Sequence, residues 1–289
     1  MSSSAEAASI ADQIRRGTLR ANPELSSYRP LDTILFYDDF DKGLHGWTEL
    51  LGNYEDNIDN VTDYPDAMDA RPPMLSSATM HDTGTAGSMR GTYSMKVATR
   101  ANRGHLAKAL KRVTFRDVSR LRCEAYFTFH PEGSTMKLGD KDVRAFGISY
   151  DLQDDEVRHW PAIRFLNAED GQRVEKWQYH AGGTRLPHLD DWEDVENGSQ
   201  ELCYNEIATK QNWHYLSWTI DLKSRQYIDL QCNDMKWDLS GKFQRPLPLY
   251  PNLRNLLNLG FFVETDCDRR AFLYIDSVLL STDGGDDNA

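Results

Sequence analysis

Hydrophobic and polar residues alternate most regularly between residues 212 and 233. The first arm of this stretch has apolar residues at every second position: Leu216, Trp218, Ile220 and Leu222. After a short polar link the pattern resumes, with Ile228, Leu230 and Cys232 on one side and Tyr227, Asp229 and Gln231 on the other. Successive side chains of a strand point to opposite faces, so this stretch predicts a β-hairpin with one apolar and one polar face.

The same period of two recurs along most of the chain. It predicts strands over residues 33–40, 91–98, 120–130, 144–153, 161–166, 175–180, 260–264 and 272–280. Their expected inward residues include Cys123, Ala125, Phe127, Phe129, Phe146, Ile148, Tyr150, Ile163 and Phe165. Helical patterns are confined to residues 5–18 and to a short Leu-rich turn at 251–259. Alternating strands without long helices are typical of an antiparallel sandwich, and Trp218 is expected in its core.

Composition and charge narrow the choice of partners. The chain has 289 residues, of which 39% are hydrophobic, enough for one large β domain. Its net charge of −12 disfavours a phosphate backbone, so no nucleic-acid partner is expected. The sequence has no apolar run of membrane-spanning length and no apolar centre of a signal peptide near its start, which predicts a cytoplasmic protein without a membrane partner. The four widely spaced cysteines are expected to be free thiols.

The two ends of the strand series resemble a known class of domain. Residues 33–48 read TILFYDDFDKGLHGWT, and residues 272–280 read FLYIDSVLL. This pair is similar to the opening and closing strands of concanavalin A-like jelly-roll domains in carbohydrate-active proteins. The resemblance implies an all-β, two-sheet antiparallel sandwich over residues 29–282, with its terminal strands side by side. Residues 1–28 are then an N-terminal arm, a candidate contact for a second copy of the chain, and residues 283–289 a flexible acidic tail.

Two segments interrupt the alternation and are candidate binding loops. Residues 51–92 are rich in Asp, Asn, Pro and Gly and follow neither the strand nor the helix period. The acidic run at 190–196, between Pro187 and Gly198, predicts a second loop that would carry Trp192 to the rim of a groove. The alternative for this second loop is a solvated surface segment without a ligand.

The polar rows of the strands supply the candidate ligand site. If the strands share one sheet, their outward residues converge on one face: Asp151, Gln153, Arg164, Lys176, Gln178, His180, Tyr215, Asp229 and Gln231. Carboxylates and amides bind hydroxyl groups, and an aromatic ring can stack on a sugar ring. We therefore expect acid–base chemistry from His180, Tyr215 and Asp229. The expected substrate-binding residues are Asp151, Gln153, Arg164, Gln178, Trp192 and Gln231. The alternative is a solvated outer face, which antiparallel sheets often have.

One short motif within this row bears on the reaction. Gln178-Tyr179-His180 resembles the Gln-x-His strand motif of jelly-roll alginate lyases. The resemblance implies that Gln178 and His180 neutralise a uronate carboxylate and assist proton abstraction. The Glu-x-Asp-x-x-Glu strand of family 16-like glycosidases is absent from the sequence. The expected function is a glycoside hydrolase or lyase acting on a small glycoside or oligosaccharide, and the alternative is a non-catalytic glycan-binding or accessory module.

Acidic residues at the two terminal strands suggest a metal. Asp39, Asp41 and Asp276 occupy a place where similar sandwich domains often hold a structural Ca²⁺, an ion that needs several oxygen ligands at once. They are therefore the candidate calcium ligands, although Asp next to Gly also suits an ordinary turn. The histidines lack metal-binding spacing, and no organic cofactor is expected.

Overall fold

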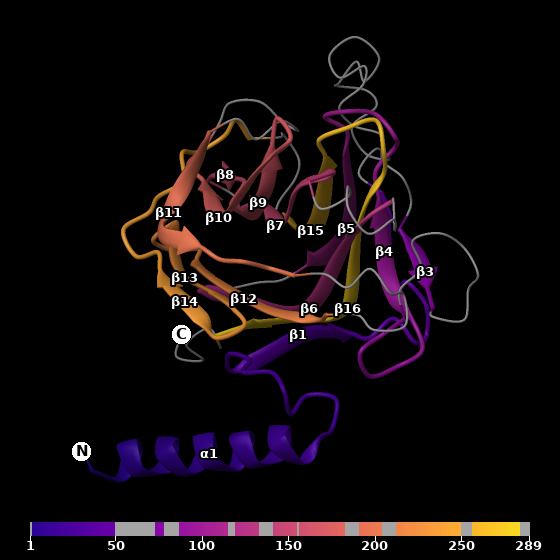
Figure 1. The fold of residues 1–289 in the computed structure, drawn as a ribbon. Coiled ribbons are helices and arrows are strands. Elements are labelled where there is room, and N and C mark those ends of the chain that lie inside the picture. Colours follow the sequence, from indigo (N-terminus) through magenta and orange to yellow (C-terminus); the bar gives the residue numbers. More distant parts are fainter. Residues whose placement is uncertain are drawn as a thin grey trace.

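The chain forms two antiparallel sheets packed face to face, with one helix at its N-terminus (Figure 1). This computed structural model describes residues 2–49, 73–77, 87–114, 119–132, 141–154, 156–182, 191–203, 212–249 and 256–283. The predicted loop at 51–92 falls mostly outside these residues, as does the predicted tail. The expected two-sheet antiparallel sandwich is confirmed.

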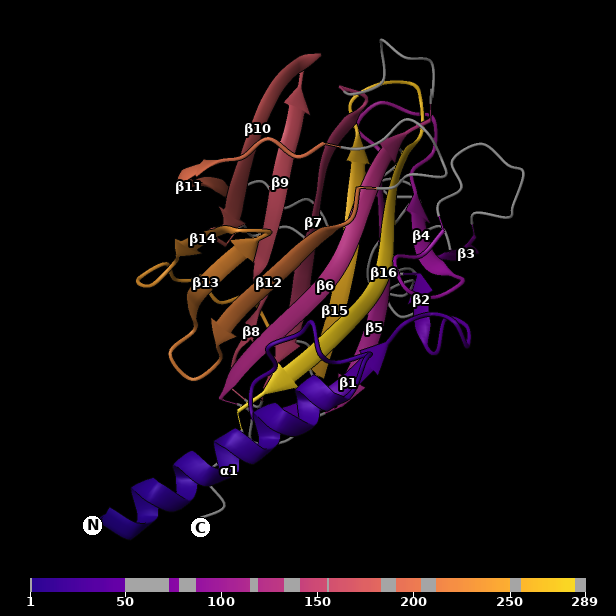
Figure 2. The ribbon, with the colours of Figure 1, turned by 60° about the horizontal axis from the view of Figure 1, so that its bottom comes forward.

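The first sheet, here called sheet A, joins the hairpin to both ends of the strand series. Its order is β14 (Met235–Asp238), β13 (Gln226–Cys232), β12 (His214–Asp221), β6 (Arg120–Pro131), β16 (Ala271–Thr282), β4 (Ser94–Ala98) and β3 (Met74–Ser76). β1 (Thr33–Asp38) pairs antiparallel with β16 beside this path. The predicted pairing of the terminal strands is therefore confirmed, and Figure 2 shows sheet A with these strands in front.

The second sheet, sheet B, is built from the middle of the chain and one late strand. Its order is β11 (Trp192–Ser199), β10 (Gln172–His180), β9 (Ala162–Glu169), β7 (Val143–Gln153), β15 (Leu256–Thr265), β5 (Leu106–Thr114) and β2 (Trp47–Glu49). The short β8 (Arg158–His159) pairs with the end of β7. Strands far apart in sequence thus become neighbours, as β7 and β15 show.

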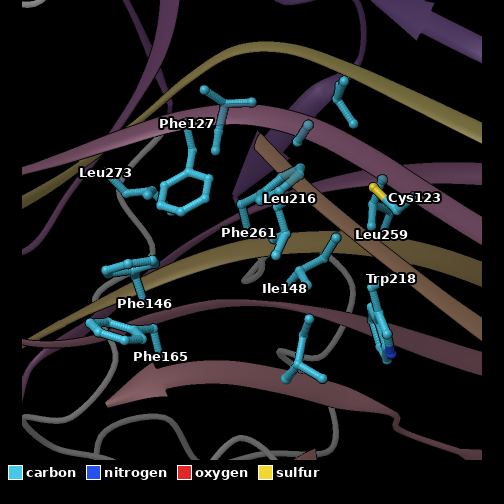
Figure 3. Close-up of a cluster of buried hydrophobic side chains, with 14 of the residues drawn as sticks. Cys123, Phe127, Phe146, Ile148, Phe165, Leu216, Trp218, Leu259, Phe261 and Leu273 are labelled. Atoms are coloured by element: carbon cyan, nitrogen blue, oxygen red, sulfur yellow. The ribbon is translucent and has the colours of Figure 1, made fainter. Parts of the chain in front are cut away.

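The core lies between the sheets and uses the inward rows that the alternation predicted. Figure 3 shows Phe127 and Leu216 of sheet A facing Phe146 and Ile148 of sheet B. Trp218 is fully buried and stacks on Tyr150, with ring centroids 4.7 Å apart. All nine inward residues expected on β6, β7 and β9 belong to this cluster. Burial of these two apolar faces is the main contribution to the stability of the sandwich.

The hairpin departs from the expected pattern at one residue. Ile220 pairs with Tyr227 and Thr219 with Asp229, so Ile228 is the extra residue of a β-bulge. The bulge shifts the alternation by one position, which places Tyr227 in the core and leaves Ile228 half-buried. The prediction that Ile228 points inward and Tyr227 outward is therefore wrong.

Three further elements differ from the expectations. The predicted acidic loop at 190–196 is largely the edge strand β11, because its Val195 and Gly198 pack inward while the acidic residues face solvent. The predicted Leu-rich turn before residue 260 is wrong where it is described, since Leu257 and Leu259 already belong to β15 and the core. β5 was not predicted, because its alternating Ala and Lys residues favour helices over strands.

The N-terminal segment attaches to the outside of sheet A. α1 (Ser2–Ala21) extends away from the sandwich in Figures 1 and 2, and its Arg15 donates a hydrogen bond to the Leu31 carbonyl. Farther along, Tyr28 donates to Ser277 and the Arg29 amide donates to Glu124. No helix among the described residues is long and apolar enough to cross a membrane. The contact of this arm with a second copy stays a prediction.

Candidate functional site

The outer face of sheet B carries an unusual number of buried polar side chains. Because Ala107, Ala109, Phe261 and Val263 point into the core, the residues between them point outward. The outward set includes Lys108, Ser149, Asp151, Arg164, Gln178, His180, Asn258 and Glu264, and each of these is less than a tenth exposed. A solvated sheet face would leave such groups in water, so this face is a candidate ligand site.

Strand register places six outward positions, three of them from this set, in one row across the sheet. From β11 to β5 the row runs through Asp194, Gln178, Arg164, Gly147, Phe262 and Lys108. At one end, Gln178 donates to Asp194 over 2.7 Å and accepts from Arg164 Nε over 2.8 Å. The row therefore begins with a chain of carboxylate, amide and guanidinium, which offers both acceptors and donors to hydroxyl groups.

Two glycines form the flat middle of this face. A Cβ atom on Gly147 would lie 2.7 Å from Phe262 Cζ, and a Cβ atom on Gly260 would lie 2.4 Å from Lys108 Cε. The Phe262 ring and the Lys108 stem thus lie across the backbone of neighbouring strands instead of standing upright. Glycine is needed at both positions because any larger residue would lift these side chains off the sheet.

Aromatic rings surround the polar row. Trp192 of β11 lies 5.7 Å from the His180 ring and 6.3 Å from the Phe262 ring, measured between centroids. The Arg164 guanidinium stacks over Trp192 at 4.3 Å. Trp192 is half-buried, so one part of this indole stays accessible for stacking.

His180 is held in a defined tautomer. Its Nδ1 lies 2.9 Å from the Trp160 carbonyl oxygen, which can only accept, so Nδ1 carries the proton and Nε2 is the basic nitrogen of the neutral ring. Burial lowers the pKa of His180, partly offset by the Trp160 hydrogen bond, and Lys108 lowers it further. The Tyr227 hydroxyl fixes the backbone here by donating to the His180 carbonyl over 2.8 Å and accepting from the Ala162 amide over 3.0 Å. A neutral, oriented imidazole can accept a proton near neutral pH.

The carboxylates of this face are held by cations. Asp151 accepts two hydrogen bonds from Arg158, at 3.0 and 3.2 Å, and a longer one from Asn258. Glu264 pairs with Arg144 at 3.0 Å and with Arg164 at 3.6 Å, and Asp194 pairs with Lys176 at 2.7 Å. All three carboxylates are therefore engaged in ion pairs, unlike the acid and base of a two-carboxylate glycosidase.

Lys108 differs from these cations. It is 5% exposed, and its Nζ lies 4.3 Å from the centre of the Trp160 ring and 5.9 Å from that of Phe262. Burial lowers the pKa of Lys108 to about 7, and only the more distant Asp151 opposes this effect. A large part of this amine is therefore neutral at physiological pH.

The structure separates the predicted site residues into two groups. Asp151, Gln153, Arg164, Gln178, His180 and Trp192 lie on sheet B, whereas Tyr215, Asp229 and Gln231 lie on sheet A. Tyr215 and Asp229 alternate with core residues of sheet A, so they point away from sheet B. There Tyr215 donates to Glu124, Asp229 pairs with Arg122, and Gln231 donates to the Asn233 carbonyl. The expected joint site of His180 with Tyr215 and Asp229 is therefore wrong, because the core lies between them.

The candidate calcium ligands do come close to one another. Asp39, Asp41 and Asp276 line one cavity of about 500 Å³ on the sheet A side. Their carboxylates accept hydrogen bonds from the protein itself, for example from the amides of Thr92 and Tyr93 to Asp41. Within the described residues, no group of three or more His, Cys, Asp or Glu side chains is placed to hold a metal ion. The calcium site stays a prediction.

Several residues of the site were not predicted. Lys108 was not predicted because its strand, β5, was not predicted. Arg158 lies in the two-residue strand β8 and Trp160 directly follows it, and a strand of two residues is too short to show a period. Phe262 and Asn258 belong to β15, whose continuous burial hides which side faces the core. The only available signal was Gly260 among large apolar residues, since glycine inside a strand often marks a close approach.

These features define an all-β protein: a two-sheet antiparallel sandwich with buried polar side chains on the outer face of one sheet. Within that class, residues 15–284 match the family described as "Domain of unknown function (DUF6772)", and the chain belongs to this family. No curated protein matches the chain.

Several solved structures are similar to the chain at low sequence identity. The CBM2 module of the evolved Dit of Lactobacillus casei BL23 phage J-1 is 9% identical, with a TM-score of 0.45 over 88% of this chain and 96% of that one. A complex of the alginate lyase Aly36B with alginate trisaccharide is 14% identical, with a TM-score of 0.40 over 73% and 93%. The basic winged bean lectin with Tn-antigen is 10% identical, with a TM-score of 0.38 over 73% and 93%. The likeness concerns the fold alone.

Proposed function

We propose that the outer face of sheet B binds a carbohydrate and that the protein acts on this ligand by acid–base catalysis. The observation that carries the proposal is the polar row formed by the exposed Asp194 and the buried Gln178 and Arg164, beside the half-buried Trp192. Paired donors and acceptors match the hydroxyl groups of a sugar, and an accessible indole offers an apolar wall for its ring.

The chemistry of this face favours catalysis over binding alone. Binding needs no titratable pair, yet His180 and Lys108 lie on one face, and the Lys108 charge lowers the pKa of His180. His180 presents a basic Nε2, and Arg164 could stabilise developing negative charge. Because the three carboxylates described above are engaged with cations, elimination by a neutral base fits better than two-carboxylate hydrolysis. A lyase is therefore the preferred reaction class.

The second candidate is a non-catalytic glycan-binding module. The engagement of Asp151, Glu264 and Asp194 favours it, because ion-paired groups hold a rigid surface without reacting. A panel of neutral and uronate-containing oligosaccharides, read by thermal shift and by product analysis, separates the two. A shift with an unsaturated product supports a lyase, and a shift without product supports the binding module.

Matched variants localise the activity to one sheet. Arg164→Gln and His180→Gln should abolish the ligand response or product formation, because both groups lie on the proposed face. Tyr215→Phe and Asp229→Asn should leave both unchanged, because these residues lie on the outer face of sheet A. Loss of the response in the sheet A pair, with retention in the sheet B pair, would contradict the assignment of the site. No thermal shift with any glycan would contradict the carbohydrate ligand.

A further inference from the structure

Three buried polar groups without partners meet on the outer face of sheet B. Lys108 Nζ has no hydrogen-bond or carboxylate partner within the described residues. Among the same residues, Trp160 Nε1 and Ser149 Oγ also lack a hydrogen-bond partner, although Trp160 is 4% and Ser149 1% exposed. Buried polar groups are nearly always satisfied in folded proteins, so three such groups in one place indicate a ligand.

Strand pairing and ring stacking bring these three residues to the same part of the outer face. Ser149 pairs with Gly260, and the Lys108 stem lies across Gly260 with Nζ 3.3 Å from the position of an added Cβ atom. Lys108 Nζ also lies 4.3 Å from the centre of the Trp160 ring. An amine, an indole N–H and a hydroxyl thus border the same part of the sheet.

Lys111, on the same strand, is a second lysine that stacks on aromatic rings and serves for comparison. Lys111 Nζ also lies over two aromatic rings, Phe36 at 4.8 Å and Trp47 at 5.8 Å, but it additionally contacts Asp38 Oδ2 at 2.7 Å. Lys111 therefore has a carboxylate partner. Lys108 has the aromatic contacts without the carboxylate, and an apolar setting of this kind favours the neutral, nucleophilic amine.

We propose that Lys108 captures the carbonyl group of an open-chain sugar as an imine. The proposal rests on the proposed function, since the carbonyl belongs to the same carbohydrate ligand. The amine nitrogen attacks the carbonyl carbon and forms a C–N bond, and the carbonyl oxygen becomes a hydroxyl group. Loss of that hydroxyl with the second amine hydrogen releases water and leaves a C=N bond, so no oxidant or reductant is needed.

The neighbouring groups suit each step. Trp160 N–H and Ser149 O–H can donate to the oxygen as negative charge develops on it. His180, on the same face, can transfer the protons that the loss of water requires. The charged group that acts on Lys108 is Asp151, which is held by Arg158. Those that act on His180 are Asp191, which raises its pKa, and Lys108 and Arg164, which lower it.

Reductive trapping tests the proposal on the full chain. The protein is incubated at pH 7 with glycolaldehyde or D-ribose and cyanoborohydride, and the modified lysines are mapped by mass spectrometry. Lys108 should be labelled at least about tenfold faster than Lys111, because burial lowers the pKa of Lys108 to about 7, whereas the Lys111 amine is held by Asp38. The labelling rate of Lys108 should level off above about pH 7.

The comparison uses two lysines of the same protein, so it does not depend on a variant that folds. Lys108→Arg should remove the fast-labelled site, with Lys111→Arg as the matched control that retains it. Labelling of Lys108 no faster than Lys111 overturns the imine proposal, whatever the glycan panel shows. A glycan thermal shift without fast labelling of Lys108 leaves the carbohydrate site standing, whereas fast labelling without any glycan shift removes the carbohydrate ligand and keeps the reactive lysine.

Discussion

Replacement of Tyr227 by Phe removes one hydroxyl group that connects the two sheets behind the proposed site. This hydroxyl accepts from the Ala162 amide at 3.0 Å and from Gln244 Nε2 at 2.7 Å, and it donates to the His180 carbonyl at 2.8 Å. The phenyl ring would keep its contacts with Trp218 and Tyr179. The change in stability therefore reports the loss of the hydrogen bonds, because the ring packing is retained.

The expected loss follows from what stays buried afterwards. A neutral hydrogen bond contributes about 1 kcal/mol net, and an unsatisfied buried donor costs about 1–3 kcal/mol. The Ala162 amide loses this partner inside the sandwich, where Tyr227 is 1% exposed. We expect Tyr227→Phe to lower the free energy of unfolding by roughly 2–4 kcal/mol. Because the same hydroxyl positions the backbone of His180, the thermal shift with a glycan should also decrease.

Denaturant unfolding, followed by tryptophan fluorescence, measures this loss. The midpoint should fall while the dependence on denaturant stays constant, since the surface exposed on unfolding hardly changes. Tyr126→Phe is the matched control, because the Tyr126 hydroxyl is half-buried and forms no hydrogen bond within the described residues. It should change stability by less than about 0.5 kcal/mol. Equal effects of the two changes would refute the bridging role of Tyr227.

Three further predictions concern the core, the flat middle of the outer face of sheet B, and Lys108. Trp218→Ala should cost roughly 3–5 kcal/mol in urea unfolding, because a fully buried ring is lost, whereas the exposed Lys236→Ala should be nearly neutral. Gly147→Ala should destabilise the protein and abolish ligand binding, since its Cβ would lie 2.1 Å from the Ile163 carbonyl oxygen. Gly17→Ala, with open space around it, is the control. An unchanged melting temperature of Gly147→Ala would contradict the need for glycine in the flat middle of the outer face of sheet B. Burial lowers the pKa of Lys108 to about 7 in the folded protein. Between about pH 7 and about 10 the unfolded chain therefore binds more protons than the folded protein, so the free energy of unfolding should rise with pH. Lys108→Met should remove this part of the slope, and an unchanged slope would mean that Lys108 is solvated.

Local pattern alone was sufficient for the fold class and for most of the core. Alternation along the strands assigned Phe127, Phe146 and Trp218 to the inside, and all three are buried. The reason is physical, since the pleat commits every second side chain to one face, and burial of one face is the strongest term in sheet formation. The pairing of β1 with β16 also followed from their likeness to terminal strands of sandwich domains. Half of the site, including Arg164, Gln178 and His180, was found in the same way.

Tertiary structure decided which strands became neighbours. A period of two assigns a side chain to a face of its own strand, but backbone hydrogen bonds are the same for every partner, so the pattern could not show that β10 and β12 belong to different sheets. For that reason Tyr215 and Asp229 were wrongly grouped with His180. A one-residue bulge at Ile228 was equally invisible, yet it brought Tyr227 into the core and against the His180 backbone. Lys108 owes its unusual environment to Trp160, Phe262 and Gly260, residues far along the chain that only the folded sheet places around it.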